Sequence, residues 1–133
     1  VRRLERGNSV AVRVAESPAV EADPRTWEVV RAAVEFCEAN YRRRVRLEEL
    51  AAVVGYSPSH LSRLISRHVG RSFLEHVVAL RMEAAMQLLE SSAPPIREIA
   101  HSLGYTDPAH FTRAFTKFTG LSPESYRRQS LTP

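Results

Sequence analysis

The chain contains the same stretch of sequence twice. Residues 47–73 read LEELAAVVGYSPSHLSRLISRHVGRSF, and residues 96–123 read IREIAHSLGYTDPAHFTRAFTKFTGLSP. The identical pairs are Glu49/Glu98, Ala51/Ala100, Gly55/Gly104, Tyr56/Tyr105, His60/His110, Arg63/Arg113, Gly70/Gly120 and Ser72/Ser122. Two copies are too few to stack into a solenoid, so the repeat predicts a compact unit that has been duplicated.

Each copy carries the signals of two short helices separated by a glycine. Gly55 and Gly104 can adopt the positive φ that ends the first helix. A capping residue and a proline then begin the second helix, which we predict at about residues 58–69 and 108–119. The residues that bound these second helices are Ser57-Pro58 and Asp107-Pro108 at the start, and Gly70 and Gly120 at the end. Two crossing helices joined by a tight turn form a helix-turn-helix motif.

Apolar residues recur at helical spacing in both copies and predict the buried face of each helix. For the first helices they are Leu47, Leu50 and Val54, and Ile96, Ile99 and Leu103. For the second helices they are Leu61, Leu64 and Ile65, and Phe111, Ala114 and Phe115.

Further helices are predicted before, between and after the two copies. Asp23-Pro24 begins a helix whose apolar stripe includes Cys37, which we therefore interpret as a core residue and not as a reactive thiol. A capping box, Ser72-x-x-Glu75, begins a linker helix that ends before the two prolines of residues 91–95. Its predicted apolar positions are Phe73, Val77, Leu80, Ala84 and Leu88, widened by Leu74, Val78, Ala85 and Leu89. Ser122-Pro123 begins a short terminal helix.

These elements predict an all-α protein in which a long linker helix joins two helix-turn-helix subdomains. The first subdomain spans residues 24–72, the linker helix 73–92, and the second subdomain with the terminal helix 93–133. Roughly 18 helical residues extend about 27 Å, which is near the spacing of about 34 Å between successive major grooves. Residues 1–23 are expected to be a linker or the remnant of an upstream domain, and the alternation over residues 10–14 suggests that domain's last strand. The initial valine predicts a fragment of a longer protein.

Basic residues are concentrated in one part of the chain. Residues 1–40 contain six arginines and seven acids, whereas residues 41–133 contain thirteen basic residues and eight acids. A basic excess confined to one part of a protein indicates a polyanionic partner.

The outward faces of the two second helices have the composition that a helix in the major groove needs. Short hydroxyls and alanine allow close approach, while arginine reaches guanine O6 and N7. The predicted base-reading residues are Ser59, Ser62 and Arg63 in the first motif, and Ala109, Thr112 and Arg113 in the second. Contact with phosphate, or with either group, is predicted for His60, Ser66, Arg67, His110, Thr116 and Lys117. For His60 and His110 an alternative role remains open, in which each side chain caps the turn or packs against it.

Other kinds of site have no support in the sequence. One cysteine cannot form an internal disulfide framework, and the five histidines lack zinc-ligand spacing. No glycine-rich phosphate loop and no pair of acids suited to acid/base catalysis occurs, so neither an enzyme nor a cofactor or metal site is expected. No apolar run approaches the roughly 20 residues that cross a bilayer, and no signal segment begins the chain. A cytoplasmic protein without a membrane partner is expected.

Two groups of arginines have open interpretations. Arg81 lies on or beside the apolar stripe of the linker helix, so it needs a partner. We expect it to brace the two halves through Glu98 or helix-end carbonyls. The run Arg42-Arg43-Arg44, with Arg46, is either a solvated loop or a set of phosphate contacts.

The repeat together with the linker VVALRMEAAMQLL resembles the AraC/XylS family of transcription regulators over roughly residues 24–128. The resemblance implies a seven-helix domain whose two recognition helices enter adjacent major grooves on one face of double-stranded DNA. It also implies a bacterial, nucleoid-associated regulator and an upstream effector-binding or dimerising domain. By position, the residues that match base-reading sites of the family are Ser59, Ser62, Arg63, Pro108, Ala109, Thr112 and Arg113.

The sequence departs from the family pattern at two places. Arg46 stands where the family usually has a serine or threonine N-cap, so the first motif helix is expected to begin less sharply. Pro108 and Ala109 offer no side-chain hydrogen bond to a base, so the second motif is expected to read sequence more weakly. A sequence-specific regulator, either activator or repressor, is the leading interpretation. An architectural DNA binder and a protein-interaction module that recruits RNA polymerase or another partner remain as alternatives.

Overall fold

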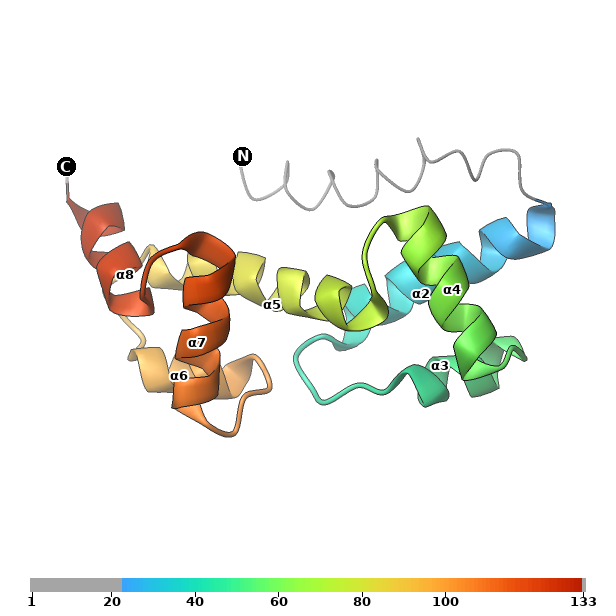
Figure 1. Ribbon diagram of the computed structural model, residues 1–133. Coiled ribbons are helices and arrows are strands. Elements are labelled where there is room, and N and C mark those ends of the chain that lie inside the picture. The colour runs from blue at the N-terminus through green and yellow to red at the C-terminus, as the bar shows by residue number, and fades with distance from the viewer. Residues whose placement is uncertain (1–22, 133) are drawn as a thin grey trace. The chain divides into compact units, whose positions relative to one another are not determined.

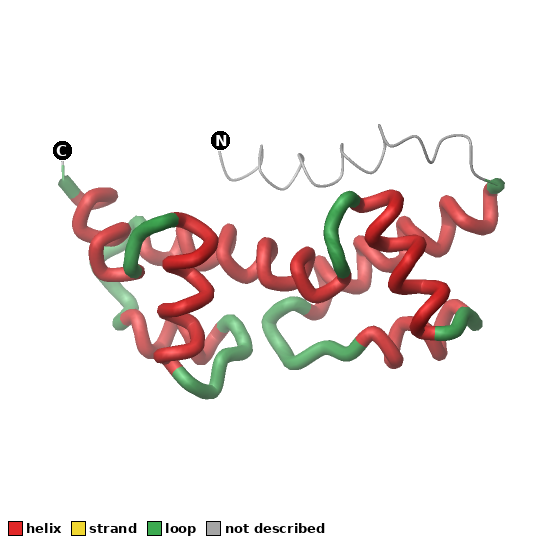
Figure 2. The backbone as a smooth tube through the Cα atoms, viewed as in Figure 1, coloured by secondary structure: helices red, strands yellow, loops and turns green. Residues whose placement is uncertain are grey.

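A computed structural model describes residues 23–132, and within them the chain forms seven α-helices and no strand (Figure 1). The helices are α2 (Pro24–Asn40), α3 (Leu47–Val54), α4 (Pro58–Val69), α5 (Phe73–Leu89), α6 (Ile96–Ser102), α7 (Pro108–Thr119) and α8 (Pro123–Leu131). The all-α class is as predicted, and α4 and α7 have the predicted bounds. The loops between these helices are short (Figure 2). The predicted linker and strand at residues 1–22 lie outside the described residues.

The described residues pack into two compact units, each with its own core. The first unit contains residues 23–40 and 45–77, and the second contains residues 41–44 and 78–132. The division therefore falls inside α5, and the loop of residues 41–44 between α2 and α3 is part of the second unit. The boundaries predicted from the sequence had assigned that loop to the first subdomain.

In the first unit, α4 packs against α2 and α3. Its apolar core is formed by Val29, Val30, Ala33, Val34, Cys37, Leu50, Ala51, Leu61, Ile65, Val69, Phe73 and Val77. Burial raises the pKa of the Cys37 thiol to about 12, with a smaller contribution from the charge of Glu38. Cys37 is therefore a core residue, as predicted, and its burial disfavours the thiolate form.

In the second unit, α7 packs against α6 and α8. Its core is formed by Met82, Ala85, Leu89, Ile99, Ala100, Leu103, Tyr105, Phe111 and Phe115, and the side chain of Tyr41 packs against it from the loop. Four of these residues belong to the apolar faces predicted for the two helices of the second motif: Ile99, Leu103, Phe111 and Phe115. No helix within residues 23–132 is long and apolar enough to cross a membrane.

Side-chain caps begin both α4 and α7 as the sequence predicts. The Ser57 hydroxyl accepts a hydrogen bond of 3.1 Å from the backbone N–H of His60 at the start of α4. The Asp107 carboxylate accepts one of 2.9 Å from the N–H of Ala109 at the start of α7. Each cap satisfies a backbone donor that has no partner inside the helix. The two helices therefore begin at defined residues, which fixes where their outward side chains lie.

The linker helix α5 buries five of the nine predicted stripe positions, together with residues outside the stripe. Leu74 is 66% exposed, whereas Ala79 and Met82, which lie outside the stripe, are buried. His76 is also buried, and its Nδ1 accepts a hydrogen bond of 3.2 Å from Arg71 Nε. A helix that is covered on more than one side buries residues around much of its circumference. The prediction of a single stripe was therefore wrong for Leu74.

The helix α3 begins without a side-chain cap, as expected from Arg46 at its N-cap. An arginine side chain has no acceptor for the first N–H groups of the helix. The carboxylate of Glu49 does accept a hydrogen bond of 3.2 Å from the backbone N–H of Arg46. One half of a capping box is therefore present, and a serine at position 46 would supply the other half.

We expect the substitution Arg46→Ser to stabilise the first unit by about 1 kcal/mol, because a serine hydroxyl would accept from the first turn of α3. Urea unfolding followed by the fluorescence of Trp27, the single tryptophan of the chain, measures this change in the first unit. Arg46→Ala is the control, since it removes the same charge without adding an acceptor. Equal stabilities of the serine and alanine variants would contradict the prediction.

Candidate nucleic-acid interface

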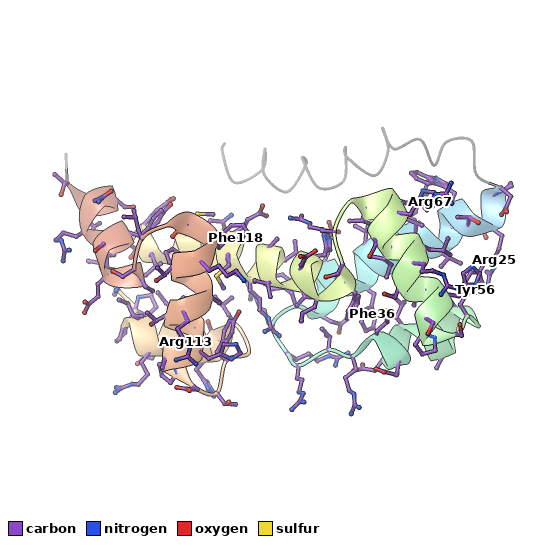
Figure 3. All side chains as sticks on the ribbon, viewed as in Figure 1. Arg25, Phe36, Tyr56, Arg67, Arg113 and Phe118 are labelled. Atoms are coloured by element: carbon purple, nitrogen blue, oxygen red, sulfur yellow. The ribbon has the colours of Figure 1, made fainter. Side chains whose placement is uncertain are left out.

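The outward face of α4 carries most of the residues predicted to contact DNA in the first motif. Leu61 and Ile65 are buried on its inner face. On the opposite side, Ser59, His60, Arg63, Ser66 and Arg67 are exposed, and Ser62 is half-buried. Figure 3 labels Arg67 on this helix. The burial of the inner face fixes the rotation of α4, so hydroxyls and guanidinium groups are presented together to solvent.

The outward face of α7 has the same organisation in the second motif. Phe111 and Phe115 are fully buried on its inner face. Ala109, His110, Arg113, Thr116 and Lys117 are exposed, and Thr112 is half-buried. Arg113, labelled in Figure 3, therefore occupies on α7 the position that Arg63 occupies on α4. The Thr116 hydroxyl donates a hydrogen bond of 2.8 Å to the Thr112 carbonyl, so its proton is used within the helix.

Both histidines of the repeat contact the tyrosine of the preceding turn. The ring of His60 stacks on Tyr56 with a centroid distance of 4.6 Å and an interplanar angle of 15°. The ring of His110 meets Tyr105 edge-on, at 5.3 Å and 85°. These contacts favour the alternative that the histidines pack against the turn, although both side chains remain exposed.

Arg25 is a residue of this region that the sequence reasoning missed. It lies in the first turn of α2, and its guanidinium donates a hydrogen bond to the carbonyl of Val54, the last residue of α3. The same group lies over the ring of Tyr56, 5.3 Å from its centroid, and Figure 3 labels both residues. Arg25 therefore stabilises the turn that leads into α4. Its position outside the repeat gave no sequence signal for this role.

Arg81 has a comparable position beside the turn of the second motif. Its Nε donates a hydrogen bond of 2.7 Å to the Tyr41 carbonyl, and its Nη2 donates one of 2.8 Å to the Arg43 carbonyl. Its guanidinium lies 5.0 Å from the centroid of the Tyr105 ring. The expected partnership with carbonyls near a helix end is present, and within residues 23–132 no bond joins Arg81 to Glu98.

The sequence predicted that Arg81 would connect the two halves of the chain, and its hydrogen bonds do not do so. Residues 41–44 and 78–132 form one compact unit, so every partner of Arg81 named above lies in its own unit. Arg81 therefore attaches the loop before the first motif to the turn of the second motif.

The described residues include no candidate metal site. No group of three or more histidine, cysteine or acidic side chains that could hold a metal ion occurs between residues 23 and 132.

Partial burial, with a contribution from the charge of Arg67, lowers the pKa of His68 at the end of α4.

Comparison with known proteins gives matches to DNA-binding regulators. The pattern of a family described as a helix-turn-helix domain matches residues 50–129. The HTH-type transcriptional regulator GlxA of Rhizobium meliloti (strain 1021) is 37% identical over 99 residues, which are 74% of this chain and 31% of that protein. The chain spans about a third of the length of curated relatives that it matches.

Solved structures agree with this match. A transcriptional regulator from Chromobacterium violaceum, described as an AraC-type DNA-binding domain-containing protein, is 26% identical with a TM-score of 0.71, covering 80% of this chain and 95% of that chain. The DNA-binding domain of AdpA, a global transcriptional factor solved in complex with a target DNA, is 29% identical with a TM-score of 0.65. That match covers 81% of this chain and 93% of the AdpA chain.

Proposed function

The chain belongs to the AraC-type family of helix-turn-helix DNA-binding domains, and we propose that it is the part of a transcription regulator that reads double-stranded DNA. In this proposal α4 and α7 enter successive major grooves as the two recognition helices. The observation that carries the proposal is the equivalence of Arg63 and Arg113. Each is an exposed arginine on the outward face of a helix whose inner face is buried in its own core.

The residue roles follow from what each side chain can offer to DNA. Arg63 and Arg113 have the length and the paired donors to bind guanine O6 and N7. Short neighbours allow the helix backbone to approach the base edges; they are Ser59, Ser62, Ala109 and Thr112. Arg67 and Lys117 lie one turn further on and are assigned to phosphates. His60 and His110 contact the turn tyrosines, so we assign them mainly to positioning the start of each recognition helix.

The rest of the regulator is part of the same proposal. The chain spans about a third of the length of its curated relatives. We therefore expect an effector-binding or dimerising domain elsewhere in the protein. RNA polymerase is a candidate partner of the assembled regulator, and the bacterial nucleoid in the cytoplasm is its expected location. Neither an activating nor a repressing role is assigned.

Selection of binding sites from a random duplex library tests this function. We expect two preferred half-sites whose centres are about 10–10.5 bp apart. The selected duplex should bind at least about 10³-fold more tightly than a scrambled one. Both affinities should fall steeply with salt. Salt-dependent binding without a preferred sequence would instead indicate an architectural binder. A chain that binds neither duplex would indicate a protein-interaction module.

Alanine at position 63 should cost about 1–3 kcal/mol of binding free energy, confined to one base pair, because alanine cannot make the bidentate hydrogen bonds to a guanine. Measuring affinities for duplexes substituted at each position of the selected site checks this. Arg67→Ala is the matched control, since removal of a phosphate ligand should weaken all sequences equally and reduce the salt slope by about 1. A loss from Arg63→Ala that is equal for all sequences would make Arg63 a phosphate ligand.

The second motif should define its half-site less sharply than the first. Pro108 and Ala109 present no hydrogen-bonding side chain at the start of α7, and the Thr116 hydroxyl uses its proton within the helix. Arg113 and contacts with thymine methyl groups then carry most of the readout there. Equally sharp base preferences in both selected half-sites would overturn this part of the proposal.

A further inference from the structure

The loop of residues 41–44 is attached to the second motif although it precedes the first in the chain. Its Tyr41 and Arg43 carbonyls accept hydrogen bonds from Arg81, and the Tyr41 side chain packs against the core of the second unit. The loop backbone also lies directly against the turn between α6 and α7. A Cβ atom added to Gly104 of that turn would be only 2.9 Å from the Arg42 carbonyl oxygen.

These contacts hold the backbone of the loop and leave its three arginine side chains, those of Arg42, Arg43 and Arg44, exposed. The guanidinium of Arg42 lies over the ring of Tyr41, 5.5 Å from its centroid, and Arg43 Nη1 donates a hydrogen bond of 2.9 Å to the Arg44 carbonyl. Three consecutive cationic side chains are therefore presented from a backbone that is fixed at several points.

The loop supplies most of the net positive charge of its unit. Residues 41–44 and 78–132 contain nine arginine and lysine residues against five acids, a net charge of +4. Without Arg42, Arg43 and Arg44 the balance would be six against five, or +1. The described part of the first unit, residues 23–40 and 45–77, contains six basic residues against seven acids, or −1. The strongest local excess of positive charge is thus fixed beside the turn that leads into α7.

We propose that the loop Arg42-Arg43-Arg44 is a phosphate-binding element of the second motif, contacting the DNA backbone beside the groove that α7 reads. This inference rests on the proposed function. In a helix-turn-helix complex the start of the recognition helix approaches the bases, so groups fixed near the turn face the flanking phosphates. Arginine binds phosphate oxygens through its planar set of donors. The loop thereby compensates for the few polar groups at the start of α7.

The double variant Arg42→Gln/Arg44→Gln tests the proposal in the whole chain. It removes two charges and keeps the backbone carbonyls that Arg81 binds. The matched control is Arg31→Gln/Arg128→Gln, which removes the same charge from exposed positions on α2 and α8. The probes are the duplex obtained by site selection and a scrambled duplex of equal length. Affinity is measured for both at several salt concentrations, and equal thermal unfolding of the two variants establishes that both remain folded.

We expect the loop variant to lower the slope of log K against log salt by about 1.8 on both duplexes, because each phosphate that the protein neutralises contributes about 0.9 to that slope. The ratio of selected to scrambled affinity should stay the same, because phosphate contacts carry no base preference. The control variant should keep a slope close to that of the wild type. Equal slopes for the loop and control variants would overturn the proposal.

Ethylation of single phosphates in the selected duplex decides which motif the loop serves. The substitution Arg113→Ala first identifies the base pair that Arg113 reads, because the preference for that pair is lost. In the wild type, ethylation of the phosphates beside this base pair should weaken binding. In the loop variant, ethylation of the same phosphates should have no effect. The loop variant could instead lose its sensitivity to ethylation at phosphates beside the base pair that Arg63 reads. That result would overturn the assignment of the loop to the second motif. A wild-type chain that binds neither duplex would refute the proposed function itself, whereas wild-type binding with an unchanged loop-variant slope refutes only this inference.

Discussion

Alanine in place of Gly104 is expected to destabilise the second unit by about 3 kcal/mol. Gly104 has a φ of +95°, a conformation that costs an alanine about 1–2 kcal/mol. The new Cβ would also lie 2.9 Å from the Arg42 carbonyl oxygen and 3.2 Å from Arg81 Nη2. Because the Arg42 carbonyl is backbone in a loop that Arg81 holds, relief of the contact requires the loop to move. Overpacking of this kind typically costs about 1–3 kcal/mol.

Gly55→Ala is the matched control, because Gly55 occupies the equivalent turn of the first motif. Its φ is +79°, and a Cβ there would meet nothing within 4 Å. Only the backbone strain should remain, so this variant should lose about 1–2 kcal/mol. Urea unfolding followed by far-ultraviolet circular dichroism measures both variants. Trp27 fluorescence additionally reports the first unit, which contains Gly55. Equal losses for the two alanine variants would mean that the contact with Arg42 adds no cost.

Methionine in place of Arg81 is the second substitution with a large expected effect, again about 3 kcal/mol in the second unit. Methionine has a similar unbranched stem and a high helix propensity, so α5 itself should be little affected. The Tyr41 and Arg43 carbonyls lose their charged donor, and each such hydrogen bond is worth about 1.5–3 kcal/mol. Hydration of these partly exposed carbonyls offsets part of that cost, while the cation–π interaction with the Tyr105 ring disappears as well.

Arg81→Lys separates charge from geometry in this experiment. Lysine keeps the positive charge but cannot direct two fixed donors at two carbonyls while lying over a ring. We expect it to recover less than half of the stability that Arg81→Met loses, as measured by the same urea unfolding. Full recovery by lysine would mean that a positive charge near the loop is sufficient and that the paired hydrogen bonds contribute little.

The sequence by itself determined the parts of this protein that depend on near neighbours in the chain. The caps at Ser57 and Asp107, the turn glycines and the apolar spacing of α4 and α7 act within a few residues of each other. They fixed the helix bounds and the buried faces, and with them the rows of side chains that face outward. Because the same signals occur in both copies, the repeated motif and its candidate DNA-reading residues could be predicted without a structure.

Only the tertiary structure decided the features that join residues distant in sequence. Arg81 lies forty positions from the Tyr41 carbonyl that it binds, and Arg25 lies twenty-nine positions from that of Val54. No local pattern specifies such partners, because they depend on which elements fold against each other. The same reason explains why Leu74 is exposed and His76 buried on one helix, and why the loop before the first motif belongs to the second unit.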